Sequence, residues 1–428
     1  MSRTAPVSVP PSTVPFGEPQ RAVGGLWIAA FAAAWVGVWM AQLGPFRVAL
    51  PLQVSAGLGA EAAWTDSVLA FGVVSGIAGA FLIVSFPVAG YLSDRTTSRF
   101  GRRRPWILGG SLLFALALLA LGVVHGLALV TICWTLALVG FSAAASALTA
   151  LINDLVPVRQ RGWVAGWMSS PRAVGIILGA VLFTSVFATV TLGYVVLAVL
   201  LVVLVVPLLV FIKEAPITRE ELPTATLSAM LRGMWVSPRA HPDFAWTWVS
   251  GFLVNAGNAL GTGLLLYYVA EPLGFGLENA RSAFLPLTLV YLLGVVASAL
   301  VCGWLSDRVA RRKVFVIWGA LIQALSALIL VFVTDYTATF VAGAVLGLGY
   351  GAYLAAGQAL ATQVIPDARD RAKDLGIMNV AYQVPVAMAP LLGAIIVASV
   401  GGFSSLFLLA GVLTAIGGAL VALVAGVK

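Results

Sequence analysis

Asp154 is the residue of this sequence that is best placed to take up and release a proton inside an apolar segment. It follows Leu151 and Ile152 near the end of a long apolar run. A carboxylate at the C-terminus of a helix faces the negative end of the helix dipole, and apolar neighbours penalise its ionised form. Arg161, which follows shortly, would favour the ionised form instead. The residues alone leave two interpretations open, a proton-exchanging acid or a permanently ionised structural pair.

Arg172 is a cation in the middle of an apolar segment. At about 1.5 Å per residue it lies about 16 Å beyond Arg161, in a hydrocarbon core about 30 Å thick. An arginine at that depth costs about 2.5–3.5 kcal/mol, so it should face a cavity and have a partner or a ligand, and Asp154 is one candidate. We interpret Arg172 as a residue that binds a substrate or takes part in proton coupling, in preference to one that only stabilises the packing of the helices. Arg47, near the end of an earlier apolar segment, is expected to reach the membrane interface.

Polar and aromatic residues at middle depth form a candidate substrate site. Planar amides can bond to the hydroxyl groups of a small ligand, and an aromatic face can pack against its C–H groups. For any single residue of the set, hydrogen bonding or packing between helices is the more common role. The candidate substrate-binding residues are Trp35, Trp39, Gln42, Arg172, Asn255, Asn258, Tyr350, Tyr353, Gln358, Asn379, Tyr382 and Gln383.

A charged loop occurs twice, half a chain apart. Gly-Tyr-Leu-Ser-Asp-Arg begins at Gly90, and Gly-Trp-Leu-Ser-Asp-Arg begins at Gly303. A carboxylate just beyond a helix can pair with arginines or with the N-terminus of a neighbouring helix, and so hold two halves of a protein in one state. Simple orientation charges would explain the arginines, but not an aspartate repeated in register with glycine. The predicted latch consists of Gly90, Asp94, Arg95, Gly101, Arg102, Arg103, Gly303, Asp307 and Arg308.

The elements that position these residues are predicted to be membrane helices. The 428 residues are 61% hydrophobic and 9% charged, with a mean hydropathy of +1.04, which excludes a soluble domain. A helix needs about 20 apolar residues to cross about 30 Å of hydrocarbon. The apolar runs predict an all-α polytopic membrane protein with twelve transmembrane helices at 25–50, 66–92, 105–124, 127–154, 162–190, 193–212, 243–270, 283–304, 314–334, 337–364, 375–399 and 402–425.

Basic residues orient this arrangement. All of the 24 except Arg47, Arg172 and Arg281 lie in the two tails or in alternate loops, which the positive-inside rule places in the cytoplasm together with both termini. The net charge of +8 therefore needs no nucleic acid. Loop 155–161 also resembles loop 364–371, as expected of two pseudo-symmetric six-helix bundles with a substrate cavity between them. The expected organisation is a disordered cytoplasmic tail at 1–21, an N-terminal bundle at 22–212, a cytoplasmic linker at 213–242 and a C-terminal bundle at 243–428.

The repeated Gly-x-x-x-Asp-Arg loop and the six-plus-six arrangement resemble the major facilitator superfamily over nearly the whole chain. The string SDRTTSRFGRRRPW, from Ser93 to Trp106, is similar to the corresponding loop of the sucrose:proton symporters, in the glycoside-pentoside-hexuronide-like branch. This resemblance implies proton-coupled symport of a disaccharide or glycoside. It also implies a coupling aspartate at the cytoplasmic end of the fourth helix and an arginine after it. Asp154 matches the aspartate by position, and Arg161 is the nearest match to the arginine.

The chemistry of the remaining residues indicates a carrier and not an enzyme. We find no nucleophile with a base, no phosphate-binding glycine loop and no metal-ligand cluster, and Cys133 and Cys302 have no spacing typical of a disulfide framework. The expected protein is a monomeric plasma-membrane carrier that binds a small-molecule substrate and a proton, without a cofactor, and works by alternating access. Two alternatives stay open: a proton-antiporting exporter of drugs or other amphipathic molecules, and a non-transporting membrane sensor on the same fold.

Overall fold

The structure is a computed structural model, and it describes most of the 428-residue chain. Side chains are not described for 158–159, 162–163, 165–170, 278, 307, 362, 371–376 and 379. The predicted tail at 1–21 lies outside the described residues except for position 19, as does the linker at 213–242 except for 214 and 236–242. The described residues are 19, 22–59, 61–183, 189–212, 214, 236–309, 311–364 and 371–425.

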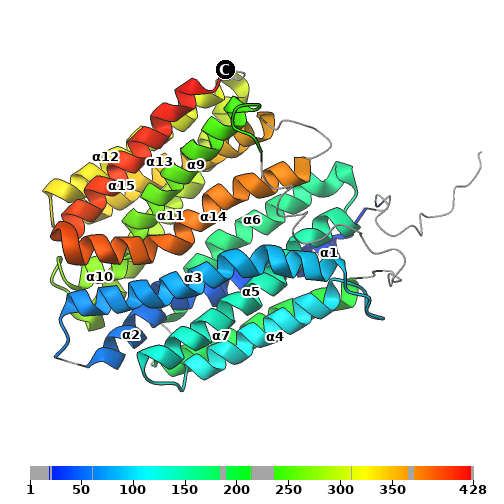
Figure 1. Cartoon of the computed structure of the whole chain (residues 1–428), viewed down its shortest axis with the longest axis horizontal. Helices are drawn as coiled ribbons and strands as arrows, with labels where there is room; N and C mark the ends of the chain where they lie inside the picture. The colour runs from blue at the N-terminus through cyan, green and yellow to red at the C-terminus, as the bar shows by residue number, and fades with distance from the viewer. Residues whose placement is uncertain are drawn as a thin grey trace, which may run out of the picture.

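Every regular element of the described part is helical, which confirms the all-α fold class (Figure 1). Each of the twelve predicted segments coincides with one helix or with consecutive helices. The elements are α1 (Gly25–Gly44), η1 (Pro45–Ala49), α2 (Leu50–Leu58), α3 (Trp64–Asp94), α4 (Arg104–Leu121), α5 (Leu127–Leu155), α6 (Val158–Val181), α7 (Val190–Phe211), α9 (Pro242–Gly263), α10 (Leu265–Ala270), α11 (Gly276–Val309), α12 (Arg312–Phe332), α13 (Tyr336–Gln363), α14 (Arg371–Ile396), η5 (Val397–Gly401), α15 (Gly402–Leu420) and η6 (Val421–Leu423).

Within the described ranges, ten helical stretches are long and apolar enough to cross a membrane. One of them runs through α14, η5 and α15, which follow one another directly, although the chain turns at Gly401 and Gly402, where φ is +143° and +71°. In α6 the apolar stretch that is fully described is Pro171–Val181. Arg172 lies in this stretch, and a charged residue within a membrane segment typically faces the interior of the helix bundle.

The helices lie side by side in two groups that meet along α3 and α14 (Figure 1). In the first half, up to residue 212, α1 packs on α6 and α7, α4 packs on α5 and α7, and α3 packs on α5. In the second half, from residue 236, α13 packs on α11 and α12, α15 packs on α9 and α12, and α14 packs on α9. Helix α3 runs along α14, so it joins the first half to the second.

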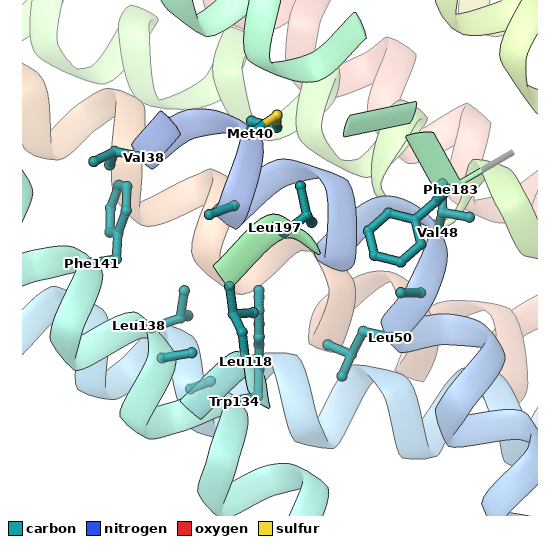
Figure 2. Packing of buried hydrophobic residues seen from close by; sticks show 14 of the residues in the cluster. Val38, Met40, Val48, Leu50, Leu118, Trp134, Leu138, Phe141, Phe183 and Leu197 are labelled. Atoms are coloured by element: carbon teal, nitrogen blue, oxygen red, sulfur yellow. The ribbon is translucent and has the colours of Figure 1, made fainter. Parts of the chain in front are cut away.

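The first-half core is filled by large side chains from several helices. Figure 2 shows Trp134 and Leu138 of α5 together with Leu118 of α4 and Leu197 of α7. Trp134, Leu118 and Leu197 are fully buried. Because a lipid bilayer supplies no hydrophobic drive between helices, close packing of this kind is what fixes their relative positions.

Small residues bring α3 and α14 into direct contact. A Cβ atom added at Gly76 would lie 2.6 Å from Leu391 Cδ2, and one at Gly79 would lie 2.7 Å from the carbonyl oxygen of Ala387. Gly72 meets Ala394 in the same way, at 2.5 Å. Glycine at these positions is therefore required by the separation of the two backbones.

Tyr267 of α10 connects the two halves at one end of the molecule. Its hydroxyl lies 3.0 Å from the carbonyl oxygen of Pro51 and 3.2 Å from Ser55 Oγ, and its ring packs on Phe71 with ring centroids 5.7 Å apart. We call the end of the molecule at which α3 and α5 end and α4 and α6 begin the basic end. Tyr267 lies at the other end, which we call the opposite end.

Candidate functional site

Arg47 lies in the interior between the two halves, at a break in the regular α-helix. It sits in the π-helical turn η1, where the N–H of Leu50 bonds to the carbonyl of Pro45. A π-turn inserts an extra residue and so changes the direction of the side chains around it, and such turns are frequent at functional sites. Arg47 lines a small pocket together with residues of α9, α10, α11, α12 and α13, and its Nε is buried without a hydrogen-bond partner in the described structure. The expectation that Arg47 reaches the membrane interface was wrong.

Arg172 is held near Arg47 by the close approach of α1 and α6. A Cβ atom on Gly179 would lie 2.7 Å from the Cα of Gly44, and one on Gly175 would lie 2.8 Å from Trp39 Cβ. At the same level the Arg172 guanidinium lies over the Trp39 ring, 5.2 Å from its centroid. This cation–π contact fixes the guanidinium plane while leaving its N–H groups available. The two arginines are close enough to interact electrostatically.

Aromatic rings of α1 form a ladder beside these cations. Trp35 and Trp39 stack with centroids 5.8 Å apart and planes inclined by 23°, and Trp39 also packs on Phe141 at 5.5 Å. The Nε1 atoms of both tryptophans and the Oε1 atom of Gln42 are buried without partners among the described residues. Buried polar atoms are normally hydrogen-bonded, so these three unpartnered atoms mark this part of α1 as a polar region of the interior.

The second half contributes amides and phenols to the opposite wall. The Tyr291 hydroxyl donates to Asn258 Oδ1 at 3.3 Å, and the Tyr350 hydroxyl donates to Asn255 Oδ1 at 2.9 Å. Tyr291 and Tyr350 interact electrostatically with both Arg47 and Arg172. Sequence reasoning missed Tyr291. The signal that identified Tyr350, a tyrosine in the middle of an apolar segment, applies to Tyr291 as well.

The other substrate-site candidates lie further from the arginine pair. Tyr353 is buried, stacks on Tyr350 with centroids 6.2 Å apart, and is hydrogen-bonded to the half-buried Tyr382. Gln383 is half-buried, and Gln358 is exposed about two turns beyond Tyr350 on α13. The side chain of Asn379 lies outside the described residues.

At the basic end, Asp154 is bound by two arginines. Arg102 Nη2 lies 2.5 Å from Asp154 Oδ1, and Arg103 Nε lies 2.7 Å from Asp154 Oδ2. Arg103 also pairs with Asp94 and donates to Ser93 Oγ at 2.6 Å. Burial acts to lower the pKa of the Arg103 guanidinium, but the Asp154 and Asp94 carboxylates outweigh it and raise the pKa above its ordinary value. One side chain therefore ties the end of α3 to the end of α5.

The arginines that sequence reasoning offered as partners of Asp154 make other contacts. Arg161 donates to the carbonyl oxygens of Val156 at 3.0 Å and Asn153 at 3.2 Å, so it covers the C-terminal end of α5. Arg172 lies over Trp39 instead. The roles of Asp154, Arg161 and Arg172 in proton coupling stay predictions.

Glu214 completes this cluster and was not identified from the sequence. Its Oε2 accepts from the backbone N–H of Arg103 at 2.9 Å. Burial raises the pKa of the Glu214 carboxyl above its ordinary value, and the hydrogen bond from Arg103 opposes the shift. Gly101 has φ +90°, a left-handed conformation that suits glycine, and a Cβ atom there would collide with the Glu214 carboxyl. The predicted latch glycine is thus the position at which Glu214 meets the loop.

The remaining latch residues contact their own half of the chain in the described structure. Arg95 lies over Tyr91 and Arg308 over Trp304, at 4.4 and 5.4 Å from the ring centroids. Gly90 faces Ser146 of α5, and Gly303 faces Ala355 of α13, which are equivalent places in the two halves. The side chain of Asp307 lies outside the described residues. A latch between the halves stays a prediction.

Comparisons with known proteins agree with this architecture. A family model described as the Major Facilitator Superfamily matches residues 67–289 and 282–428. The chain is similar to the crystal structure of a peptide transporter POT, with a TM-score of 0.71 and 14% identity over 95% of this chain and 96% of that one. A POT family transporter in complex with 5-aminolevulinic acid gives a TM-score of 0.68 and 13% identity over 95% of this chain and 98% of that one. At this identity the likeness shows the fold alone.

Two curated relatives match shorter parts. A general alpha-glucoside permease of Schizosaccharomyces pombe is 30% identical over 187 residues, 39% of this chain and 32% of the permease. An uncharacterized symporter of Synechocystis is 48% identical over 58 residues, 14% of this chain and 10% of the symporter. The chain therefore spans about a third of the first relative and about a tenth of the second.

Proposed function

The chain belongs to the Major Facilitator Superfamily, so it is a membrane transporter and not an enzyme, and we propose that it carries a glycoside together with a proton. In this proposal two six-helix bundles rock about the pocket between them, with both termini in the cytoplasm of the cell that bears the protein in its plasma membrane. The observation that carries the proposal is the polar and aromatic interior at middle depth, built by α1 and α6 from one half and α9, α11 and α13 from the other.

The residues of this interior suit a sugar. Trp35 and Trp39 place aromatic side chains beside the polar groups, a combination that is typical of sugar sites. Their unpartnered Nε1 atoms and Gln42 Oε1 supply two donors and one acceptor for hydroxyl groups. The names of the two partial relatives, an alpha-glucoside permease and a symporter, support a sugar carried with an ion.

Asp154 is the acid that we assign to proton coupling. Its carboxylate is shared by Arg102 and Arg103, so protonation removes the charge that holds both guanidiniums. Arg103 also holds Asp94 at the end of α3, and α3 is the helix that runs along α14 of the other half. A proton on Asp154 therefore loosens the tie between α3 and α5 and frees α3 to shift against α14.

Transport into proteoliposomes tests this proposal. With an inward proton gradient, radiolabelled maltose or sucrose should accumulate. The Asp154→Asn variant should lose the proton dependence of uptake and keep exchange of labelled for unlabelled sugar. Asp66→Asn is the matched control, because Asp66 is an exposed acid at the opposite end. Extrusion of drugs without uptake of any glycoside would replace the proposal by the exporter, and unchanged pH dependence in Asp154→Asn would remove Asp154 from the mechanism.

A further inference from the structure

Arg47 reaches from the first half of the chain into a small pocket that the second half builds. The other described residues that line this pocket belong to α9, α10, α11, α12 and α13, and none of them is acidic. Among the described residues the ion pairs join Arg102 and Arg103 to Asp94 and Asp154 at the basic end, so Arg47 takes part in none of them. The positive charge of Arg47 therefore enters the second half without a carboxylate beside it.

One hydroxyl group of the pocket lining differs from its neighbours. Thr262 Oγ1 donates to the carbonyl oxygen of Asn258 at 2.9 Å, and Thr339 Oγ1 donates to that of Asp335 at 2.7 Å. Such bonds to the preceding turn are the usual way in which a helical threonine satisfies its hydroxyl. Thr288 is only 2% exposed, and its Oγ1 is buried without a partner among the described residues. Its hydroxyl is thus left to a ligand of the pocket.

The two unpartnered groups of the pocket ask for a ligand that accepts hydrogen bonds and is negatively charged. The Nε–H of Arg47 can only donate, and the hydroxyl of Thr288 can donate as well. A water molecule would accept both bonds, but it would leave the guanidinium charge uncompensated. Arg172 makes this charge more costly, because it is close enough to repel Arg47.

The size of the pocket restricts the ligand further. Its volume is about 30 Å³, whereas a single water molecule needs about 10–15 Å³. The pocket therefore admits one or two groups of the size of water, which is far too little for a sugar ring with its hydroxyl groups. A monatomic anion combines the required charge with the required size.

We infer that the pocket is a site for a small halide anion, chloride or bromide, which Arg47 Nε–H and the Thr288 hydroxyl hold between them. This site is separate from the proposed sugar site. Because Arg47 belongs to the first half and Thr288 to α11, the anion joins the two halves in the conformation in which Tyr267 also connects them. A ligand that binds one conformation better shifts the population toward it, so chloride stabilises this conformation of the carrier.

Thermal unfolding of the purified full chain in nanodiscs tests the site without any sugar. Sodium chloride is titrated against sodium gluconate at constant ionic strength. Chloride and bromide should raise the unfolding temperature with a saturating dependence, because they bind the folded chain, whereas gluconate is too large for the pocket. This dependence should disappear in Arg47→Gln. Thr288→Val keeps the shape of the side chain without its donor, and it should raise the half-saturating chloride concentration at least about tenfold, which corresponds to about 1.4 kcal/mol.

Thr339→Val is the matched control. Thr339 lines the same pocket and is also 2% exposed, but its hydroxyl already bonds to a backbone carbonyl. This variant should keep the half-saturating concentration of the wild type. In gluconate, Arg47→Gln should unfold at a temperature no lower than the wild type, because it removes an uncompensated charge. Crystals grown in bromide should show its anomalous signal between Arg47 and Thr288, and a bromide found only elsewhere overturns the site.

Labelling by a membrane-impermeant reagent tests the conformational effect. A cysteine introduced at Ser67, whose carbonyl oxygen lies 3.3 Å from the Tyr267 hydroxyl, should be labelled more slowly in chloride than in gluconate. The difference should be lost when Thr288→Val is added. Unchanged labelling at a chloride concentration that saturates the thermal shift overturns the link between the halves.

The remaining outcomes separate the anion site from the proposed function. Equal chloride dependence in the wild type and both pocket variants indicates a general salt effect and overturns the site. Loss of the dependence in Arg172→Gln but not in Arg47→Gln places the anion outside the pocket and overturns it as well. Glycoside uptake without any chloride dependence leaves the sugar carrier and assigns the pocket to water. Chloride-dependent stability that requires Arg47 and Thr288, without uptake of any glycoside, supports the anion site and overturns the sugar.

Discussion

Replacing Arg103 by glutamine tests whether one side chain ties α3 to α5. The change removes a guanidinium that is only 4% exposed and bonds to Asp154, Asp94 and Ser93. Glutamine keeps a polar end but carries no charge, so Asp94 loses an ion partner, while Asp154 keeps Arg102.

The expected loss of stability follows from the exposure of the two carboxylates. Removing one partner of a buried ion pair costs about 3–5 kcal/mol. Asp94 is 45% exposed, so losing its ion pair with Arg103 should cost about as much as losing a surface pair, about 0–1 kcal/mol. Asp154 is 14% exposed and contributes the larger share, which Arg102 reduces. We expect Arg103→Gln to lower the free energy of unfolding by about 3 kcal/mol, at the lower end of the range for buried pairs.

A double-mutant cycle with Asp154→Asn isolates the pair. Unfolding by SDS in mixed micelles gives the free energy for the wild type, both single variants and the double variant. The coupling energy between Arg103 and Asp154 should be about 2 kcal/mol. Arg99→Gln, at an exposed position of the same loop, should stay within about 0.5 kcal/mol of the wild type. A coupling energy near zero, or equal effects of Arg103→Gln and Arg99→Gln, would refute the tie.

Three further predictions follow from single contacts. Burial raises the pKa of Glu214 above 4.5, so between these two pKa values the folded protein holds a proton that the unfolded chain has released. Stability should therefore fall as pH rises from 4.5 through the raised pKa. Glu214→Gln should abolish this fall in a pH series of thermal unfolding. Gly79→Ala should reduce transport and stability more than Gly261→Ala, because its Cβ would meet a backbone carbonyl whereas that of Gly261 has nothing within 4 Å; equal effects would contradict the close contact of α3 and α14. Tyr267→Phe removes the hydrogen bonds at the opposite end and should increase labelling of a cysteine introduced at Ser67 by a membrane-impermeant reagent, and unchanged labelling would exclude Tyr267 as a seal.

The helices were predictable because the bilayer requires them. Hydropathy and loop charges locate segments such as 127–154 almost to the residue, since α5 runs from Leu127 to Leu155. The partners of Asp154 were not predictable. Arg159 and Arg161 are near in sequence, yet the arginines that bind Asp154 come from the loop between α3 and α4, which only the packing of α3, α4 and α5 brings there.

Arg47 shows a second limit of sequence reasoning. Its place close to the end of an apolar run favoured the interface, because the prediction ended the first helix near residue 50. The structure continues that helix to Leu58 and inserts a π-turn at Pro45–Ala49. Both differences move Arg47 inward, and neither has a signal in composition, since Pro45 alone would more commonly indicate a helix start or a kink. Arg47 could be recognised as an unpaired charge at middle depth only in the structure, which places it near Arg172.

The two charged sites of the protein share no residue, and this constrains the coupling between them. Asp154 belongs to a cluster at the basic end, whereas Arg47 and Arg172 line the interior at middle depth. In the proposed mechanism the coupling then passes through helix movement, by way of α3 with its tie to Asp154 at one end and its glycine contacts with α14 toward the other. Asp154→Asn should accordingly abolish the pH dependence of uptake while the affinity of the interior site for the sugar stays as in the wild type. Should that variant also bind the sugar more weakly, as measured by equilibrium binding to the purified protein, the proton and the substrate would be acting on one common site, and the separation inferred from the structure would be wrong.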